Sequence, residues 1–240
     1  AALLHEAGFS VAVFEADRIA MGVTGHTTAK ITSQHGLLYD YLTTQFSKEQ
    51  AAVYAEANQS AIARLDSLVS TRSIDCDFIR KDAYTYAASE KDIFELAAEV
   101  KAAEALGLPA TFMERTSLPF ETRGAIRFGE QAQFHPRKYL LALSRQLASA
   151  GCHIFENTRV MNIQEGAPCE IITRKGSVKA GHVVVASCFP FKDPGFYFAR
   201  MYPSRSYVLA ARLNEPVPDG MFYSAAEPHY SIRSQVSEHG

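Results

Sequence analysis

Residues 10–32, "SVAVFEADRIAMGVTGHTTAKIT", constrain the fold more than any other stretch of the chain. The apolar run "VAVFEA" is typical of a buried strand, and it includes the carboxylate of Glu15 near its end. A loop of glycine and threonine follows and runs to Lys30. Upstream, "AALLHEAGF" predicts a short helix that stops at Gly8. The fold must therefore place a helix beside a strand whose acidic end opens into a loop of small, hydrogen-bonding residues.

A helix followed by a strand that ends in an acidic residue resembles the second half of a dinucleotide-binding βαβ unit. In such a unit the strand-end carboxylate accepts hydrogen bonds from a ribose diol. No strand with a glycine-rich turn precedes Ala1. We therefore expect the sequence to be part of a longer protein. The alternative for Glu15 is a solvent-exposed glutamate after an ordinary helix–strand pair.

Composition excludes several classes of protein. A chain of 240 residues can hold one large domain or two interleaved ones, and its 47% hydrophobic and 21% charged residues are typical of a globular protein. A net charge of −2 does not favour nucleic acid or an anionic membrane as a partner. No apolar run approaches the roughly 20 residues that span a bilayer. The four cysteines are far apart, which predicts reduced thiols in a cytoplasmic protein and no metal site: Cys76, Cys152, Cys169 and Cys188.

Three helices are predicted further along the chain. Ser47 and Gln50 form a capping-box pattern that opens a long helix. Its predicted buried stripe consists of Val53, Ala57, Ala61, Leu65 and Leu68. Ser89 opens a second helix that stops at Gly107, and Pro136 opens a third that ends before Gly151.

Strands are predicted between and after these helices. We expect a strand pair over "DFIRKDAYTYAA", a strand and loop over "GAIRFGEQAQFHP", and strands in 153–163, 169–176 and 177–187. Within the last of these, "HVVVA" is typical of a strand buried in a parallel sheet. A separate antiparallel sheet is predicted from "SYVLAARL", "GMFYSA" and "HYSIRS".

Four segments, in this order, resemble the D-amino-acid-oxidase superfamily of FAD-dependent oxidoreductases, which includes glycine oxidase and sarcosine oxidase. They are "FEAD", "GVTGHTTAK", "HPRKYLLALSRQLASAGCHIFENTRV" and "GHVVVAS". The resemblance covers about residues 1–235. The variants "GHTTAKIT" and "ASCFPF" are similar to a bacterial subgroup whose members often carry a C-terminal Rieske iron–sulfur domain.

The resemblance implies a mixed α/β (α+β) fold. An incomplete Rossmann-like FAD-binding domain, residues 1–35 plus 136–188, is expected to interleave with an antiparallel-sheet substrate domain, residues 36–135 plus 189–240. It also implies FAD as the cofactor.

The resemblance further implies which residues bind the cofactor. Glu15, with Ala16 beside it, is expected at the ribose. The loop residues expected at the pyrophosphate and flavin are Gly22, Thr24, Gly25, Thr27, Thr28, Ala29 and Lys30. Small residues let the backbone approach a ligand, N–H groups donate to phosphate, and a cation stabilises reduced flavin. The alternative is a solvated loop with a surface lysine.

The resemblance also implies roles for residues at other positions that match the family pattern. The backbone of Val160 is expected at the adenine, with plain strand core as the alternative. Ala186 and Ser187 stand where relatives have a small turn beside the cofactor, although "ASCFPF" departs from that pattern. Arg205 and Arg233 are expected to bind substrate; each has an ion-paired surface residue as its alternative. No catalytic residue or metal ligand is predicted, and His26, His35 and His135 are interpreted as structural.

The function predicted for the full-length protein is oxidation of a small amine or amino/imino acid by hydride transfer to flavin. One alternative is a nicotinamide-dependent dehydrogenase, and another is a fragment that does not retain cofactor. Expected partners are the small-molecule substrate and a Rieske iron–sulfur domain, with no nucleic acid or membrane.

Overall fold

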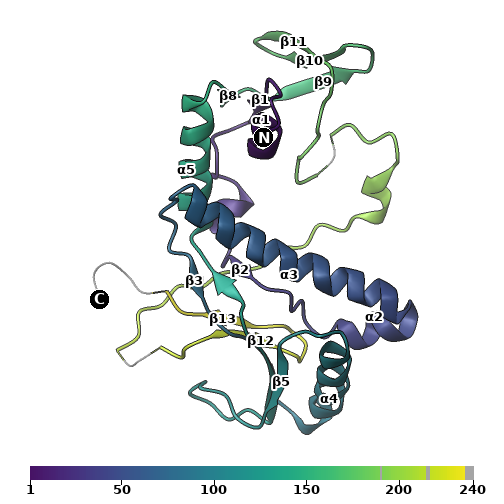
Figure 1. Cartoon of the computed structure of the whole chain (residues 1–240), viewed down its shortest axis with the longest axis vertical. Helices are drawn as coiled ribbons and strands as arrows, with labels where there is room; N and C mark the ends of the chain where they lie inside the picture. Colours follow the sequence, from purple (N-terminus) through teal and green to yellow (C-terminus); the bar gives the residue numbers. More distant parts are fainter. Residues whose placement is uncertain (190, 215–216, 236–240) are drawn as a thin grey trace. The chain divides into compact units, whose positions relative to one another are not determined.

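A computed structural model describes residues 1–189, 191–214 and 217–235 (Figure 1). The predicted mixed α/β fold is confirmed, since helices alternate with both parallel and antiparallel strands. The chain divides into two compact units, one of residues 1–26 with 140–212 and the other of residues 27–139 with those from Leu213 onward. The assignment of cofactor binding to 1–35 with 136–188, and of substrate binding to the rest, stays a prediction.

The first unit begins with the expected helix and strand. Helix α1, Ala2–Glu6, gives way at Gly8, whose φ of +87° favours glycine, to strand β1, Ala12–Phe14. β1 pairs in parallel with β8, His153–Phe155, and the rings of Phe14 and Phe155 stack at 5.1 Å. β8 follows helix α5, Pro136–Ser149, which begins and ends where the sequence predicts.

A three-stranded antiparallel sheet follows in the same unit. Its order is β11-β10-β9, and its strands are β9 (Val160–Gln164), β10 (Cys169–Thr173) and β11 (Gly176–Ala180). Ile163 and Ile171, which are register partners, are its buried contacts. A short 3₁₀ helix, η2 (Tyr197–Arg200), lies further along.

Two predicted strands of this unit are wrong. Residues 182–186, "HVVVA", form no strand, and Val184 is 76% exposed. Residues 206–213 form none either, and Tyr207 and Leu209 are both 93% exposed. An apolar run becomes a strand only where its backbone N–H and C=O groups find partners. In the part of the chain that the structure describes, no strand pairs with either run.

The second unit is built on a five-stranded sheet of order β13-β12-β4-β6-β5. Its strands are β4 (Ala83–Ala87), β5 (Ala110–Met113), β6 (Gly124–Phe128), β12 (Met221–Ser224) and β13 (Ser231–Arg233). β12 and β13 confirm two of the strands predicted for the last part of the chain, but the prediction of a separate antiparallel sheet is wrong, because β12 joins β4 and so extends this sheet. Neighbours are antiparallel except β12 and β4, which pair in parallel with Met221 opposite Ala83.

A smaller sheet of order β2-β7-β3 completes the strands of this unit: β2 (Lys30–Ile31), β7 (Ala132–Gln133) and β3 (Ile79–Arg80). The strand pair expected over residues 77–88 is therefore only partly correct. Both strands exist, but β3 pairs with β7 and β4 pairs with β6.

Helices α2 (Tyr39–Gln45), α3 (Lys48–Thr71) and α4 (Glu90–Ala105) cover part of this unit. The predicted caps are confirmed, since Ser47 accepts a hydrogen bond from the Gln50 N–H and Ser89 forms a capping box with Asp92. The predicted stripe of α3 is wrong. Val53 is 67% exposed, and the buried positions are Ala51, Ala55 and Ile62, which lie on a different face of the helix from the predicted stripe.

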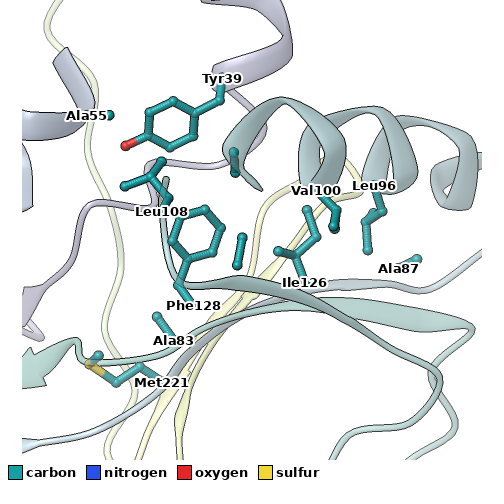
Figure 2. Packing of buried hydrophobic residues seen from close by; sticks show 12 residues of the cluster. Tyr39, Ala55, Ala83, Ala87, Leu96, Val100, Leu108, Ile126, Phe128 and Met221 are labelled. Carbon is teal, nitrogen blue, oxygen red and sulfur yellow. The ribbon is translucent and has the colours of Figure 1, made fainter. Parts of the chain in front are cut away.

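The core lies between the helices and the five-stranded sheet (Figure 2). Leu96 and Val100 of α4 face Ile126 and Phe128 of β6. Tyr39 stacks on Phe128 with ring centroids 6.1 Å apart. Burial of this apolar surface supplies most of the stability of the unit.

One charged side chain is buried in this core. Glu99 of α4 has 0% exposure and accepts three backbone hydrogen bonds from the start of α2. Its Oε1 accepts from the N–H groups of Leu38 (2.8 Å) and Tyr39 (2.9 Å), and its Oε2 accepts from Asp40 (2.8 Å). These are N–H groups that no helical carbonyl can satisfy. The carboxylate of Glu99, which belongs to α4, thus caps the N-terminus of α2 and stabilises the partial positive charge at that end of the helix.

We predict that Glu99→Gln lowers the free energy of unfolding by about 2–3 kcal/mol, since hydrogen bonds to a charged group are lost and a buried NH₂ is turned toward N–H donors. Glu95→Gln, on the exposed side of the same helix, is the matched control and should change stability by less than about 0.5 kcal/mol. Urea unfolding measures both. Equal effects would show that Glu99 does not cap α2.

Candidate functional site

Glu15 follows the C-terminal end of the parallel strand β1, as the sequence predicts. Its N–H donates to the carbonyl of Phe155 (2.9 Å), and its carbonyl accepts from Thr158 (2.8 Å). The carboxylate Oε1 accepts from the Asp17 N–H at 2.9 Å. This hydrogen bond holds the Glu15 side chain against the backbone two residues further on, at Asp17. The second carboxylate oxygen can then accept from another donor, such as a sugar hydroxyl.

A hollow lies directly beyond this strand end. Its lining comes from two turns and the residue after Glu15: Ala16, Asn157, Thr158, Arg159, Thr173, Arg174 and Lys175. The Asn157 N–H donates to the carbonyl of Asp17 at 2.7 Å, which holds the first of these turns to the segment that follows Glu15. Val160, the predicted adenine contact, opens β9 immediately after this lining.

The charge of this hollow was not predicted from the sequence. Arg159, Arg174 and Lys175 give it three cations, and Lys175 Nζ donates to Thr158 Oγ1 at 3.2 Å. The basic turn "TRKG" could have indicated an anion-binding hollow. It lies so far from Glu15 along the chain that the sequence did not show that the two are close together. A carboxylate beside a basic hollow suits a nucleotide, which offers hydroxyls and phosphates.

The Gly/Thr loop begins with the 3₁₀ helix η1, Val23–His26. The Gly25 N–H donates to the carbonyl of Gly22 at 3.0 Å. A Cβ on Gly25 would lie 2.0 Å from the carbonyl oxygen of Ala20, so no other residue fits there. Thr24 is exposed.

The loop continues into the second unit as Thr27–Lys30. Ala29 is buried with a φ of +46°, and its N–H donates to Thr27 Oγ1 at 3.2 Å. A left-handed alanine costs free energy, so the chain is held there by its surroundings. The conformation directs the Thr28 carbonyl to one side of the loop and leads Lys30 into β2.

Two predicted residues, Lys30 and Arg233, lie close together at the end of this loop. Lys30 Nζ donates to Ser231 Oγ at 2.5 Å and lies 5.3 Å from the ring centre of Tyr223. Arg233 Nη1 donates to the carbonyl of Thr28, and Nη2 donates to Gln235 Oε1 at 2.6 Å. Arg233 Nε is buried and has no hydrogen-bond partner among the described residues. Ser231 and Tyr223 were not predicted, although Ser231 stands two residues before Arg233 and so shares its face of the strand.

The two cations affect each other. Burial, and after it the charge of Arg233, lowers the pKa of Lys30 from 10.5 to about 8. Burial also lowers the pKa of Arg233, against the opposing charge of Asp77. Within the described residues neither cation forms an ion pair. Two half-buried positive charges with an unused N–H donor form a site for an anion.

The remaining predicted residues belong to the first unit. Ala186, Ser187 and Arg205 are exposed and lie in segments without regular secondary structure. No group of three or more His, Cys, Asp or Glu side chains within the described ranges could hold a metal ion.

Sequence comparison identifies the family. The FAD dependent oxidoreductase family matches residues 1–236. The chain belongs to this family of FAD-dependent oxidoreductases. The predicted cofactor and enzyme class are thereby confirmed, and the nicotinamide alternative receives no support. The donor groups of each unit also fit FAD in kind: the first unit has a carboxylate suited to a ribose and a basic hollow suited to a nucleotide, and the second unit has two cations suited to an electron-rich ring.

Three relatives of this FAD-dependent oxidoreductase are informative. YhfW of Bacillus subtilis (strain 168), named as a Rieske 2Fe-2S iron–sulfur protein, is 37% identical over 235 residues, which cover 97% of this chain and 46% of YhfW. Gamma-glutamylputrescine oxidoreductase of Escherichia coli (strain K12) is 24% identical over 189 residues, covering 76% of this chain and 44% of that protein. The crystal structure of glycine oxidase from Geobacillus kaustophilus shares the fold with a TM-score of 0.59 at 21% identity, covering 74% of this chain and 48% of the other.

The chain spans about half the length of the curated relatives that it matches. The resemblance to the D-amino-acid-oxidase superfamily is confirmed, and the name of YhfW supports the Rieske-associated subgroup. Of the helices in the described ranges, none combines the length and the apolar character needed to cross a membrane.

We predict that Lys30→Met stabilises the protein at pH 7 and that this gain disappears at higher pH. The pKa of Lys30 is about 8 in the folded protein and 10.5 in the unfolded chain. At pH values between these two, the unfolded chain therefore binds more protons than the folded protein. Stability of the unmodified protein should therefore rise relative to the variant as pH increases from about 8 to 10.5. Urea unfolding at pH 7 and pH 10 measures the difference. Lys30→Arg, which stays charged, should show no such rise, and a pH-independent gain for Lys30→Met would contradict the assignment.

Proposed function

We propose that the full-length protein oxidises a small amino or imino acid, or a related amine, at the carbon next to nitrogen. The observation that carries this proposal is the pair of half-buried cations, Lys30 and Arg233, with the unpartnered Nε of Arg233 beside them. A carboxylate is the anion that a guanidinium binds best, through two parallel hydrogen bonds. Two relatives have names that agree with this class of substrate, since glycine oxidase is named for an amino acid and gamma-glutamylputrescine oxidoreductase for an amine derivative.

The chain's own residues would divide the work of binding. Glu15 would accept hydrogen bonds from the ribose of FAD, and the hollow beside Ala16 would take the nucleotide. The remaining predicted loop residues would approach the pyrophosphate and flavin, as would Lys30, whose charge stabilises electron density on the ring. When bound, FAD supplies a two-electron acceptor for the hydride of the substrate carbon.

Arg233 would hold the substrate carboxylate and so fix the orientation of the α-carbon. Its Nη1 bond to the Thr28 carbonyl anchors the guanidinium and leaves Nε free to donate. Most of the effect of such a clamp is orientation, because a reacting carbon must be held at a defined angle and distance. Lys30 adds positive charge but not a planar fork, so it complements Arg233 without replacing it.

A Rieske iron–sulfur domain in the full-length protein is part of the same proposal, and its support is the name of YhfW. A one-electron centre of this kind would accept electrons from the reduced enzyme. Iron and acid-labile sulfide in the purified full-length protein would support the partner, and their absence from protein that retains flavin would count against it.

We predict that Glu15→Gln weakens FAD binding. The charge-assisted hydrogen bonds lost are worth about 1.5–3 kcal/mol, which corresponds to a rise in the Kd for FAD of about tenfold or more. Asp17→Asn removes the same charge two residues away and should leave FAD binding nearly unchanged. Flavin retained after gel filtration of the full-length variants measures the effect, and equal retention in both would refute the role of Glu15.

We predict that Arg233→Lys raises the KM for an amino acid at least tenfold and changes the KM for the matched amine without a carboxylate by less than threefold. The physical reason is that lysine cannot make the two parallel hydrogen bonds to a carboxylate. Steady-state kinetics with both substrates tests this in the full-length enzyme. Arg205→Lys is the comparison variant, and a larger selective effect there would transfer the carboxylate clamp from Arg233 to Arg205.

A further inference from the structure

Gln133 of β7 contains an unused buried acceptor. The residue is 3% exposed, and its Nε2 donates to the carbonyl of Ser234 at 3.3 Å. Within the described residues its Oε1 has no hydrogen-bond partner. The orientation of the amide is fixed by chemistry, because a carbonyl can only accept, so the NH₂ group must face Ser234 and the oxygen must face away. A buried acceptor left unpaired is costly, which points to a donor from a ligand.

The strand pairing places this acceptor beside the two cations. Gln133 is directly opposite Lys30 in the antiparallel β2–β7 pair, so both side chains project from the same face of that sheet. Both also reach the same strand end, since Lys30 bonds Ser231 and Gln133 bonds Ser234. Arg233 lies between these two contacts along the chain.

Two buried atoms around β13 therefore lack partners in the part of the chain that the structure describes, and one is a donor while the other is an acceptor. Arg233 Nε is a donor that needs an acceptor, and Gln133 Oε1 is an acceptor that needs a donor. A free α-amino acid offers both, with its carboxylate for the guanidinium and its ammonium N–H for the amide oxygen. A simple carboxylate would satisfy Arg233 and leave Gln133 unpaired.

We propose that Gln133 Oε1 accepts a hydrogen bond from the amino group of the substrate whose carboxylate Arg233 binds. This inference rests on the proposed function and makes Gln133 the residue that selects for amino acids over carboxylates without nitrogen. A site built to bond an N–H rejects the analogue that lacks it, because its own buried polar atom then stays unpaired.

The test uses two ligands that differ only at the group in question. In 2-aminoisobutyrate the α-carbon carries an amino group and no hydrogen, so it cannot be oxidised there. Pivalate has a methyl group in place of the amino group. Calorimetric titration of the full-length, FAD-loaded protein with each ligand gives a preference ratio without turnover. We expect the unmodified protein to bind 2-aminoisobutyrate about 10- to 100-fold more tightly than pivalate.

Gln133→Met removes the acceptor at similar size and should abolish this preference while pivalate binding stays within threefold. Gln133→Glu keeps an acceptor oxygen and adds a negative charge, so it should bind pivalate more weakly and increase the preference. Arg233→Lys should weaken both ligands together. Flavin content and thermal unfolding of each variant establish that the site is folded.

The outcomes distinguish a wrong role for Gln133 from a wrong substrate class. If the unmodified protein binds both ligands but Gln133→Met and Gln133→Glu leave the preference unchanged, the role of Gln133 is wrong and the proposed function stands. If Gln133→Met shifts the flavin spectrum and the Kd for FAD while both ligands bind as before, the acceptor serves the flavin N–H instead, and the proposal is overturned. If FAD-loaded protein binds neither ligand, the proposed substrate class fails, and the inference fails with it.

Discussion

The arrangement of the second unit depends on the parallel pairing of β12 with β4. Met221 and Phe222 are 1% and 0% exposed, and they pair with Ala83 and Tyr84 from a distant part of the chain. These side chains hold the strand in place from both faces of the sheet, because Met221 packs in the core cluster on one face and Phe222 packs in the cluster on the other. The hairpin from β12 to β13 then carries Arg233 to the carbonyl of Thr28. The cluster of Lys30 and Arg233, which we propose as an anion site, thus depends on the pairing of a strand late in the sequence with one from its first half.

The same site opposes folding. Lys30 and Arg233 are partly desolvated, have like charges, and form no ion pair within the described residues, while Arg233 Nε and Gln133 Oε1 are buried and unpaired. Such features lower stability and concentrate where a ligand completes them. The apolar core and the capping of α2 by Glu99 supply stability elsewhere in the unit. A ligand that offers an anion and an N–H donor would relieve the charge repulsion and both unpaired groups at once.

The sequence predicted correctly those features that depend on neighbouring residues, such as helix caps and strand ends. Ser47 and Ser89 cap helices where expected, because a capping residue acts within one turn. Glu15 is at its strand end for a similar reason. The strand predicted over residues 182–186 was wrong, because a strand needs a neighbouring strand to pair with, and the apolar pattern of one segment does not show whether such a neighbour exists. A role for Gln133 could not be predicted from the sequence, because β7 is only two residues long. The surroundings of Gln133 are set by Lys30 and Ser234, which lie far away in the sequence. The family resemblance predicted the cofactor, whereas only the long-range pairing of β12 with β4 and of β13 with β12 brings Arg233 close to Lys30.

The central claim is that this flavin-dependent fold takes hydride from a carbon next to nitrogen. Anaerobic mixing of the full-length, FAD-loaded protein with a panel of small amino acids, each with hydrogen or deuterium on the α-carbon, tests it most directly. The account predicts that at least one amino acid bleaches the visible absorption of the flavin, and that the deuterated form does so more slowly because the bond to the α-carbon breaks in that step. A flavin that stays oxidised with every amino acid and amine, but is reduced by a nicotinamide cofactor, would contradict it.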